Sequence, residues 1–202
     1  MSERRYYMAC LDLEGRDCLV VGGGRVALEK VRGLLDCGAR VTVVAPRAVE
    51  ELARLPVAWL RRRYRSSDLE GRRLVIAATS LPSLNRRVFA DAEARGVFCN
   101  VVDVPELCSF ILPAVHRQDP LAIAVSTGGA SPALAQRIKR ELAERYGPDY
   151  AALARSLRAL RPWAKERFET YEERRDFFQE LVERALRGDG GRPSMRARRP
   201  AA

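Results

Sequence analysis

The stretch DCLVVGGGRVALEKVRGLLDCG, residues 17–38, decides the fold of this chain. It starts with a short, mostly apolar run that is typical of a buried strand, and three glycines follow directly. The remainder repeats apolar residues at helical spacing, and Gly38 is suited to end the helix because glycine readily adopts a left-handed conformation. A strand, a glycine turn and a helix in this order predict the first unit of a parallel α/β sheet.

The glycine turn has the spacing Gly22-x-Gly24-x-x-Ala27, which is typical of dinucleotide-binding sites when it joins a strand to a helix. Gly22 permits the tight turn, Gly24 lets the backbone approach a pyrophosphate, and Ala27 allows the helix to pack closely on the strand. The free N–H groups at the helix N-terminus would hold the phosphates. The alternative is a turn of the same shape that binds no ligand.

One part of the dinucleotide pattern is missing. An acidic residue is expected about 20 residues further on, at the end of the second strand, to bind the ribose hydroxyls. This position reads Val-Ala-Pro-Arg over residues 44–47, and the first acids are Glu50 and Glu51. Arg47 could face a 2′-phosphate or touch only the cofactor backbone, so the residues alone leave NAD and NADP open.

Strands and helices alternate up to residue 107, which predicts a parallel sheet with right-handed crossovers. The predicted strands are 17–21, 40–46, 72–79 and 97–102, with an edge strand within 56–64, and the predicted helices are 25–38, 48–55 and 82–96.

The pattern changes after residue 107, where two strand-like runs follow each other with no helix between them, which predicts an antiparallel pair. A helix is predicted next, with Ser131 as its N-cap and Pro132 at its first position. The remaining predicted elements are strands over 108–117 and 120–127, and helices over 131–147, 149–161 and 163–187, the last two separated by Pro162.

Asp103 follows an apolar strand directly, which is an unusual place for a lone carboxylate. Ligands of open parallel sheets bind beyond the carboxyl ends of the strands, where Thr79 and the glycine turn are also predicted to lie. A carboxylate there could act as a general base or acid toward a substrate beside the nicotinamide. Alternatively, Asp103 only turns the chain before Pro105, since aspartate is common in turns.

A second turn, VSTGGASP at 125–132, also leads from a strand into a helix. Its hydroxyls and free amides could bind substrate carboxylates. Alternatively, Ser131 caps the helix and Gly128 and Gly129 only shape the turn; both interpretations can hold together.

The composition excludes several classes of protein. No window approaches the roughly 18 apolar residues of a membrane span, and no signal peptide is visible, so we expect a cytoplasmic protein that binds no membrane. The net charge of +10 suits a polyanionic partner, but zinc-finger spacing is lacking and Lys and Arg are scattered, which disfavours nucleic acid.

The cysteines and the single histidine, His116, predict no metal site. No two cysteines are spaced as C-x-x-C, so we expect small core residues in a reducing compartment. A single histidine at a strand end is typical of a surface residue. The five cysteines are Cys10, Cys18, Cys37, Cys99 and Cys108.

Four stretches together resemble the precorrin-2 dehydrogenases of siroheme biosynthesis, which occur alone or as the N-terminal module of larger siroheme synthases. The resemblance covers about residues 5–146, and the succession NVVD, SFILP and STGGASP is its most specific part. The stretches are LVVGGGRVALEKVRGLLDCGARVTVVAP, LVIAATSLPSLNRRV, FCNVVDVPELCSFILPAV and LAIAVSTGGASPALAQRIKREL.

The resemblance implies NAD-dependent oxidation of precorrin-2 to sirohydrochlorin, with Asp103 as the catalytic acid of NVVD. It also implies a tetrapyrrole substrate and a homodimer. The cofactor-binding residues it implies are Gly22, Gly24, Arg25, Val26, Pro46, Arg47 and Thr79. The residues it implies for the substrate are Asn100, Ser126, Thr127, Gly128 and Gly129.

The expected fold is therefore α/β: a Rossmann-like parallel sheet, a small α+β dimerisation region and a C-terminal helical region. The expected bounds are 1–112 for the NAD-binding domain, 113–147 for dimerisation and the substrate cleft, 148–187 for the helices and 188–202 for a disordered basic tail.

Two competing interpretations remain at this point. Some members of the family also insert ferrous iron into sirohydrochlorin, for which His116 is the only histidine available. A non-catalytic nucleotide-binding sensor would keep Gly22 and Gly24 without needing Asp103.

Overall fold

The computed structural model describes residues 5–187, so the predicted disorder at 188–202 lies outside the described residues. The chain divides into an N-terminal unit, which ends at Leu112, and a C-terminal unit, which begins at Pro113. No helix within 5–187 is long and apolar enough to cross a membrane.

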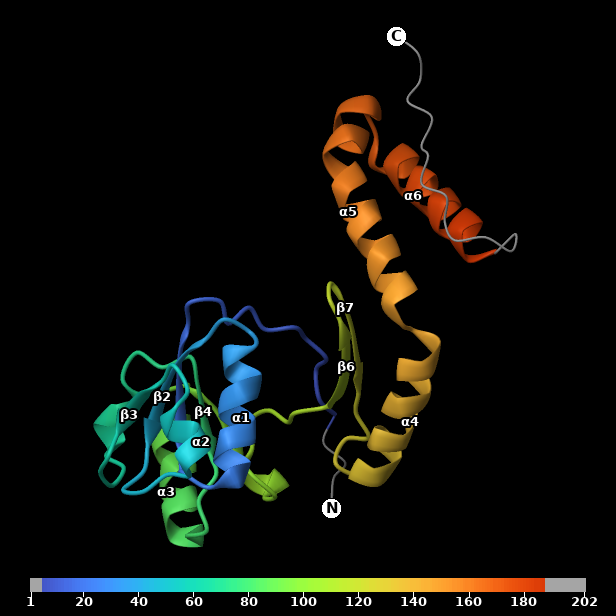
Figure 1. Cartoon of the computed structure of the whole chain (residues 1–202). Helices are drawn as coiled ribbons and strands as arrows, with labels where there is room; N and C mark the ends of the chain where they lie inside the picture. The colour runs from blue at the N-terminus through green and yellow to red at the C-terminus, as the bar shows by residue number, and fades with distance from the viewer. Residues whose placement is uncertain (1–4, 188–202) are drawn as a thin grey trace. The chain divides into compact units, whose positions relative to one another are not determined.

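The N-terminal unit, which Figure 1 shows, is built on a parallel sheet. The strand order of this sheet is β3-β2-β1-β4-β5. The order reverses between β1 and β4, which marks the point where open α/β sheets bind ligands. This topology confirms the predicted Rossmann-like fold. Its elements are β1 (Asp17–Val21), α1 (Arg25–Leu35), β2 (Arg40–Val44), α2 (Glu50–Ala53), β3 (Ala58–Leu60), η1 (Ser66–Leu69), β4 (Leu74–Ala77), α3 (Pro82–Glu93), β5 (Phe98–Val101) and η2 (Pro105–Leu107).

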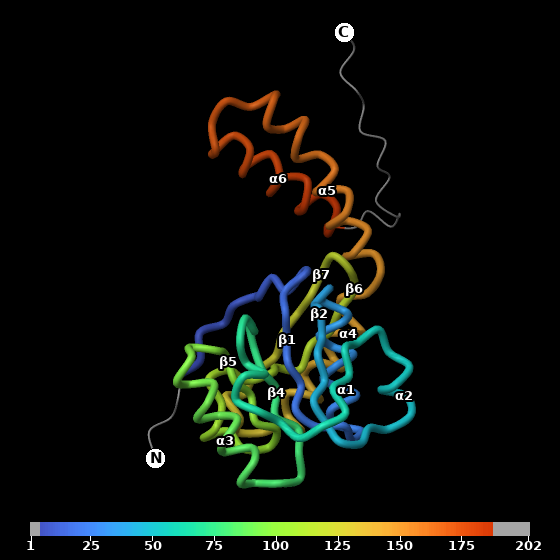
Figure 2. Tube along the Cα trace, turned by 90° about the vertical axis from the view of Figure 1, so that its left-hand side faces the viewer, coloured from blue at the N-terminus to red at the C-terminus, as the bar shows by residue number. Residues whose placement is uncertain are grey.

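Both faces of this sheet are covered, as Figure 2 shows for α1 and α3 on opposite sides of the strands. Alternate residues of β1 enter the two cores: Cys18 and Val20 pack with α1, whereas Leu19 and Val21 pack with α3. All four are 1% exposed or less. A strand buried on both faces reads as a continuous apolar run, which is why these residues predicted a parallel sheet.

The two edges of the sheet are protected differently. At one edge, β3 has three residues and lies where the sequence predicted an edge strand. At the other, Asn100 of β5 forms a bridge with Cys108, and the Ser109 N–H donates to the Cys99 carbonyl at 2.8 Å. The chain beyond η2 therefore lies along the outer side of β5.

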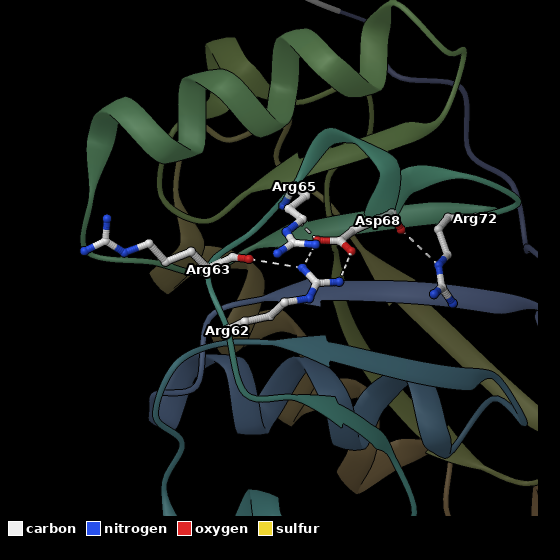
Figure 3. Close-up of polar contacts among 5 residues, drawn as sticks. All are labelled: Arg62, Arg63, Arg65, Asp68 and Arg72. Atoms are coloured by element: carbon white, nitrogen blue, oxygen red, sulfur yellow. Dashed lines mark hydrogen bonds and ion pairs between the residues drawn. The ribbon is translucent and has the colours of Figure 1, made fainter.

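A buried carboxylate fixes the segment between β3 and β4 (Figure 3). The Arg62 guanidinium donates to both oxygens of Asp68, at 2.9 and 2.5 Å, and the Arg65 N–H donates to the same side chain at 2.8 Å. Burial alone would raise the pKa of Asp68, but the hydrogen bonds from Arg62 and Arg65 hold it below the usual value. The Arg72 Nε donates to the Asp68 carbonyl at 3.1 Å, which links this segment to the start of β4.

The C-terminal unit begins with an antiparallel pair, which confirms the predicted change of pattern. The first strand starts only at Ala114, and not at residue 108 as predicted, because Cys108 and Ser109 already bond to β5. Ser131 caps α4 as predicted by accepting from the Leu134 N–H at 3.2 Å. The elements are β6 (Ala114–Gln118), β7 (Leu121–Val125), α4 (Pro132–Arg145), α5 (Pro148–Arg167) and α6 (Tyr171–Leu186).

The predicted helix break at Pro162 is wrong, because α5 continues through this proline to Arg167. The chain breaks instead before Thr170, which caps α6 and forms a capping box with Glu173. An aromatic cluster of Trp163 and Phe168 with residues of α6 joins the two helices. A proline inside a helix is unfavourable, and here the helix that contains it packs against the next helix through this cluster.

Candidate functional site

The carboxyl ends of three strands meet at Gly22. Its φ is +128°, and a Cβ built there would lie 2.3 Å from the Ala78 carbonyl oxygen, so no larger residue fits. The Gly22 N–H donates to the Val44 carbonyl at 3.0 Å. Gly22 therefore brings the end of β1 between the ends of β2 and β4.

Gly23 brings the segment after β2 onto the same turn. A Cβ at Gly23 would lie 2.1 Å from the Arg47 carbonyl oxygen, and the Val49 N–H donates to the Gly23 carbonyl at 2.8 Å. Pro46 and Arg47 are exposed beside this contact. The predicted cofactor residues of the two strand ends thus lie together.

Gly24 and the first turn of α1 form an open cradle. Gly24 is the N-cap of α1, and no atom lies within 4 Å of a Cβ built on it. The first turn carries no acidic residue, Arg25 and Val26 are exposed, and Ala27 is buried against the sheet. Because the first N–H groups of a helix have no acceptor within it, this cradle fits the pyrophosphate of a dinucleotide.

Thr79 lies at the end of β4, next to Gly22, but its hydroxyl also has an internal partner. It donates to the Asn85 Oδ1 at 2.6 Å, and the Asn85 Nδ2 donates back to the Thr79 carbonyl at 3.0 Å. This pair fixes the start of α3. The cofactor contact of Thr79 stays a prediction.

Asp103 is both a turn residue and an exposed acid at the same edge of the sheet. The Val102 N–H donates to the Ala77 carbonyl at 3.0 Å, so the exits of β5 and β4 are adjacent. The Val104 N–H closes the turn on the Val101 carbonyl at 3.2 Å, and Asp103 takes a φ of +60°. Among the described residues, no other non-glycine residue has a positive φ. The two interpretations of Asp103 are therefore compatible.

The Cys108 thiol holds the loop that carries Asp103. Its Sγ accepts from the Val101 N–H at 3.3 Å. It also lies 3.2 Å from the Val101 carbonyl and 3.3 Å from the Val104 carbonyl, either of which can accept its hydrogen. Cys108 thus touches the chain on both sides of Asp103, a role that no spacing in the sequence indicates.

Asn100, predicted for the substrate, lies buried in β5. Its Nδ2 donates to the Phe110 carbonyl at 3.0 Å and lies 3.5 Å from the Cys108 Sγ. The side chain therefore positions the loop after η2, and its contact with a substrate stays a prediction.

The predicted substrate turn, Ser126 to Gly129, belongs to the C-terminal unit. Thr127 Oγ1 accepts from the Ser131 N–H at 3.0 Å, and Ser126 Oγ accepts from the Gly128 N–H at 3.2 Å. Gly128 and Gly129 have φ values of +63° and +92°. The hydroxyls thus stabilise the turn, and substrate binding by these residues stays a prediction.

The described residues contain no group of three or more metal-ligating side chains. The His116 Nε2 lies 2.8 Å from the Tyr146 carbonyl, so this nitrogen carries a proton and donates it. Residues Cys10, Cys18, Cys37, Cys99 and Cys108 are free thiols. Burial raises the pKa of Cys18 to about 11 and that of Cys99 to about 12, so neither is a ready nucleophile.

Comparison with known proteins identifies the family of the chain. Residues 9–114 match a family described as putative NAD(P)-binding, and residues 118–145 match the central region of sirohaem biosynthesis proteins. The solved structure of SirC, precorrin-2 dehydrogenase, is 30% identical, with a TM-score of 0.73, and the match covers 94% of this chain and 93% of that one. The chain belongs to the precorrin-2 dehydrogenase family.

Longer members of this family match the chain over only part of their length. The siroheme synthase of Ectopseudomonas mendocina is 44% identical over 85% of this chain and 37% of its own length. That of Chromobacterium violaceum is 42% identical over 90% of this chain and 39% of its own length. The chain thus spans less than half of these curated relatives.

Proposed function

We propose that this chain oxidises precorrin-2 to sirohydrochlorin with NAD as the hydride acceptor. The observation that carries the proposal is the position of Asp103, an exposed acid at the same sheet edge as the glycine turn. Membership of the precorrin-2 dehydrogenase family supplies the substrate class.

The cofactor site consists of the cradle at Gly24 and the segment beside it. The N–H groups of Arg25, Val26 and the following residue would bind the pyrophosphate, and the exposed Arg47, whose backbone contacts Gly23, would add positive charge nearby. When bound, NAD supplies a two-electron acceptor for hydride. Gly22 and Pro46 shape the walls of this opening, and Thr79 borders it.

The dehydrogenation removes a hydride and a proton from the macrocycle, so the chain must supply a proton acceptor. We assign this role to the Asp103 carboxylate, which is exposed at the edge where the nicotinamide would lie. The left-handed turn and the Cys108 contacts keep this carboxylate on a fixed backbone. A fixed base needs little reorganisation before it accepts a proton.

Substrate binding is assigned to Asn100 and the turn Ser126–Gly129, whose N–H groups could face the carboxylates of a tetrapyrrole. The net charge of +10 favours such a polyanionic substrate. We also propose a homodimer, which light scattering after gel filtration would test, and a cytoplasmic location, where free thiols persist.

An anaerobic assay tests the function directly. Purified protein is supplied with NAD and enzymatically generated precorrin-2, and NADH and the macrocycle spectrum are followed together. We expect NADH and sirohydrochlorin to form at equal rates. Ferrous iron is then added, and siroheme formation faster than without the protein would establish the iron-inserting activity as well.

The Asp103→Ala variant tests the assigned base. We expect it to lose most turnover while binding NAD as tightly as the wild type, because Asp103 does not form the cradle. Normal turnover of this variant would exclude Asp103 as the base. Absence of NADH with the wild type, with substrate and NAD both intact, would exclude the dehydrogenase itself.

A further inference from the structure

A hollow lies at the amino ends of the parallel strands, whereas the proposed cofactor site lies at their carboxyl ends. Its volume is about 350 Å³, and it opens at the amino ends of β1, β2 and β4. Neither the glycine turn nor Asp103 takes part in it. Its lining residues are Gly15, Arg16, Asp17, Arg40, Gly71, Arg72 and Arg73.

The backbone around this hollow is held by hydrogen bonds between neighbouring strands. Gly15 and Gly71 take φ values of +62° and +70° in the turns that lead into β1 and β4. The Arg40 N–H donates to the Arg16 carbonyl at 2.9 Å, and the Arg73 N–H donates to the Asp17 carbonyl at 2.8 Å. Three chain segments therefore present arginines at one fixed rim.

Two of these arginines are already oriented. Arg40 donates to both carboxylate oxygens of Asp17, at 3.0 and 2.6 Å. Arg72 is held by the carbonyl of Asp68 (Figure 3) and lies 3.9 Å from the Asp17 carboxylate. The hydrogen bond from Arg40 holds the pKa of Asp17 below its usual value, so this carboxylate is charged at neutral pH.

The other two arginines, Arg16 and Arg73, do not pair with Asp17. Arg16 and Arg73 are exposed, and within residues 5–187 neither guanidinium has an ion pair or hydrogen bond with another side chain. The lining thus holds four guanidinium groups and one carboxylate, that of Asp17, which leaves an excess of three positive charges around a hollow of small-molecule size. Such an excess of positive charge favours the binding of an anion.

We propose that this hollow binds an oligophosphate, either free or as part of a nucleotide. Guanidinium groups match phosphate oxygens with paired hydrogen bonds, and a diphosphate carries about the charge that the excess requires. A smaller hollow of about 180 Å³ adjoins the first and shares Arg16 and Arg73. Its lining includes the exposed apolar side chains of Leu11 and Phe98, which could take the organic part of a nucleotide, and also one carboxylate, that of Asp12.

Isothermal titration of the full chain with inorganic pyrophosphate, at low and physiological salt, tests this site. The variants are Arg16→Ala and Arg73→Ala, and the matched control is Arg63→Ala, an exposed arginine of the same unit that points away from Asp68 (Figure 3). We expect saturable binding by the wild type and the control, and about tenfold weaker binding by each hollow variant. Thermal melting and NAD titration on the same proteins should show unchanged folding and an unchanged cofactor site.

The outcomes separate the ligand sources from one another. If ADP binds more tightly than pyrophosphate, and if this difference in affinity disappears in Arg16→Ala and Arg73→Ala, the ligand is a nucleotide. Equal affinities of ADP and pyrophosphate would identify a free oligophosphate. No saturable binding by the wild type, unchanged binding by Arg16→Ala and Arg73→Ala, or an equal loss in Arg63→Ala would overturn the proposal. Because the hollow lies at the amino ends of the strands and the proposed cofactor site at their carboxyl ends, this result is independent of the dehydrogenase assay.

Discussion

A substitution at Gly24 can test the proposed cofactor site without disturbing the fold. Its φ of −81° is ordinary for any residue, and a Cβ there meets no atom within 4 Å. We expect Gly24→Ala to change the free energy of unfolding by less than about 0.5 kcal/mol. The methyl group would occupy the path of the pyrophosphate, so we expect NAD to bind at least about tenfold more weakly, measured by titration.

Gly33, in the same helix, provides the control for this substitution. A Cβ at Gly33 also meets no atom, and the residue is exposed on α1. We expect Gly33→Ala to stabilise the protein by about 0.5–1 kcal/mol and to leave NAD binding unchanged. If Gly24→Ala binds NAD as the wild type does, the cradle is not the pyrophosphate site.

Asp103 combines a backbone conformation suited to glycine with an exposed acid. Left-handed backbone costs about 1–2 kcal/mol for most residues, and Asp103 has a φ of +60°. We expect Asp103→Gly to raise the free energy of unfolding by about 0.5–1 kcal/mol while abolishing turnover. Asp103→Asn should abolish turnover without this gain. Denaturant unfolding checks both, and a less stable Asp103→Gly would show that the carboxylate itself supports the turn.

The loop from Asp103 to Cys108 depends on one buried thiol. Removing the Sγ in Cys108→Ala leaves the Val101 N–H without this acceptor, and we expect a loss of about 1–3 kcal/mol of stability. Because the loop positions Asp103, we also expect a lower kcat with an unchanged affinity for NAD. Cys99→Ala removes a similar volume from the buried β5 strand but none of the thiol contacts to the loop, and an equal fall in its kcat would contradict the positioning role.

The buried carboxylate of Asp68, between β3 and β4, should make the stability of the protein depend on pH in the acid range. The folded pKa of Asp68 lies below the ordinary value of 3.8, so its stabilisation is complete above pH 3.8 and is lost as the pH falls through the folded pKa. We expect Asp68→Asn to lower the free energy of unfolding by about 3 kcal/mol at pH 7. The difference in this free energy between the variant and the wild type should narrow below about pH 4. Denaturant unfolding at pH 7 and pH 3 measures this gap. The exposed neighbour Glu70, changed to Gln, should show no such gap, and a constant gap for Asp68→Asn would contradict the ion-pair explanation.

The sequence predicts these elements where local pattern determines them. Strands such as β1 and β4 are buried on both faces and therefore read as apolar runs. Pro162 misleads because the local preference of proline does not reveal that α5 packs against the next helix, α6, through an aromatic cluster. At the site, the location of Asp103 follows from the strand that precedes it, whereas its φ and its Cys108 clamp depend on contacts that have no local pattern.

For the molecule as a whole, the proposed cofactor site belongs to one unit only. We expect NAD to slow amide hydrogen exchange at the strand exits of the N-terminal unit, at residues 22–28, 45–49 and 78–81, because these segments border the cradle. Mass spectrometry of peptides from the exchanged protein measures this. Protection confined to 15–17 and 71–73 instead would place NAD in the arginine hollow and contradict the assignment of the glycine turn.

The segment that lies along β5 also bears on the tendency of the protein to aggregate. An open strand edge is a template on which another chain can pair and aggregate. The bridge from Asn100 to Cys108 covers this edge, and the same Cys108 anchors the Asp103 loop. We therefore expect mutations that loosen the loop to open this strand edge to other chains and to lower turnover together.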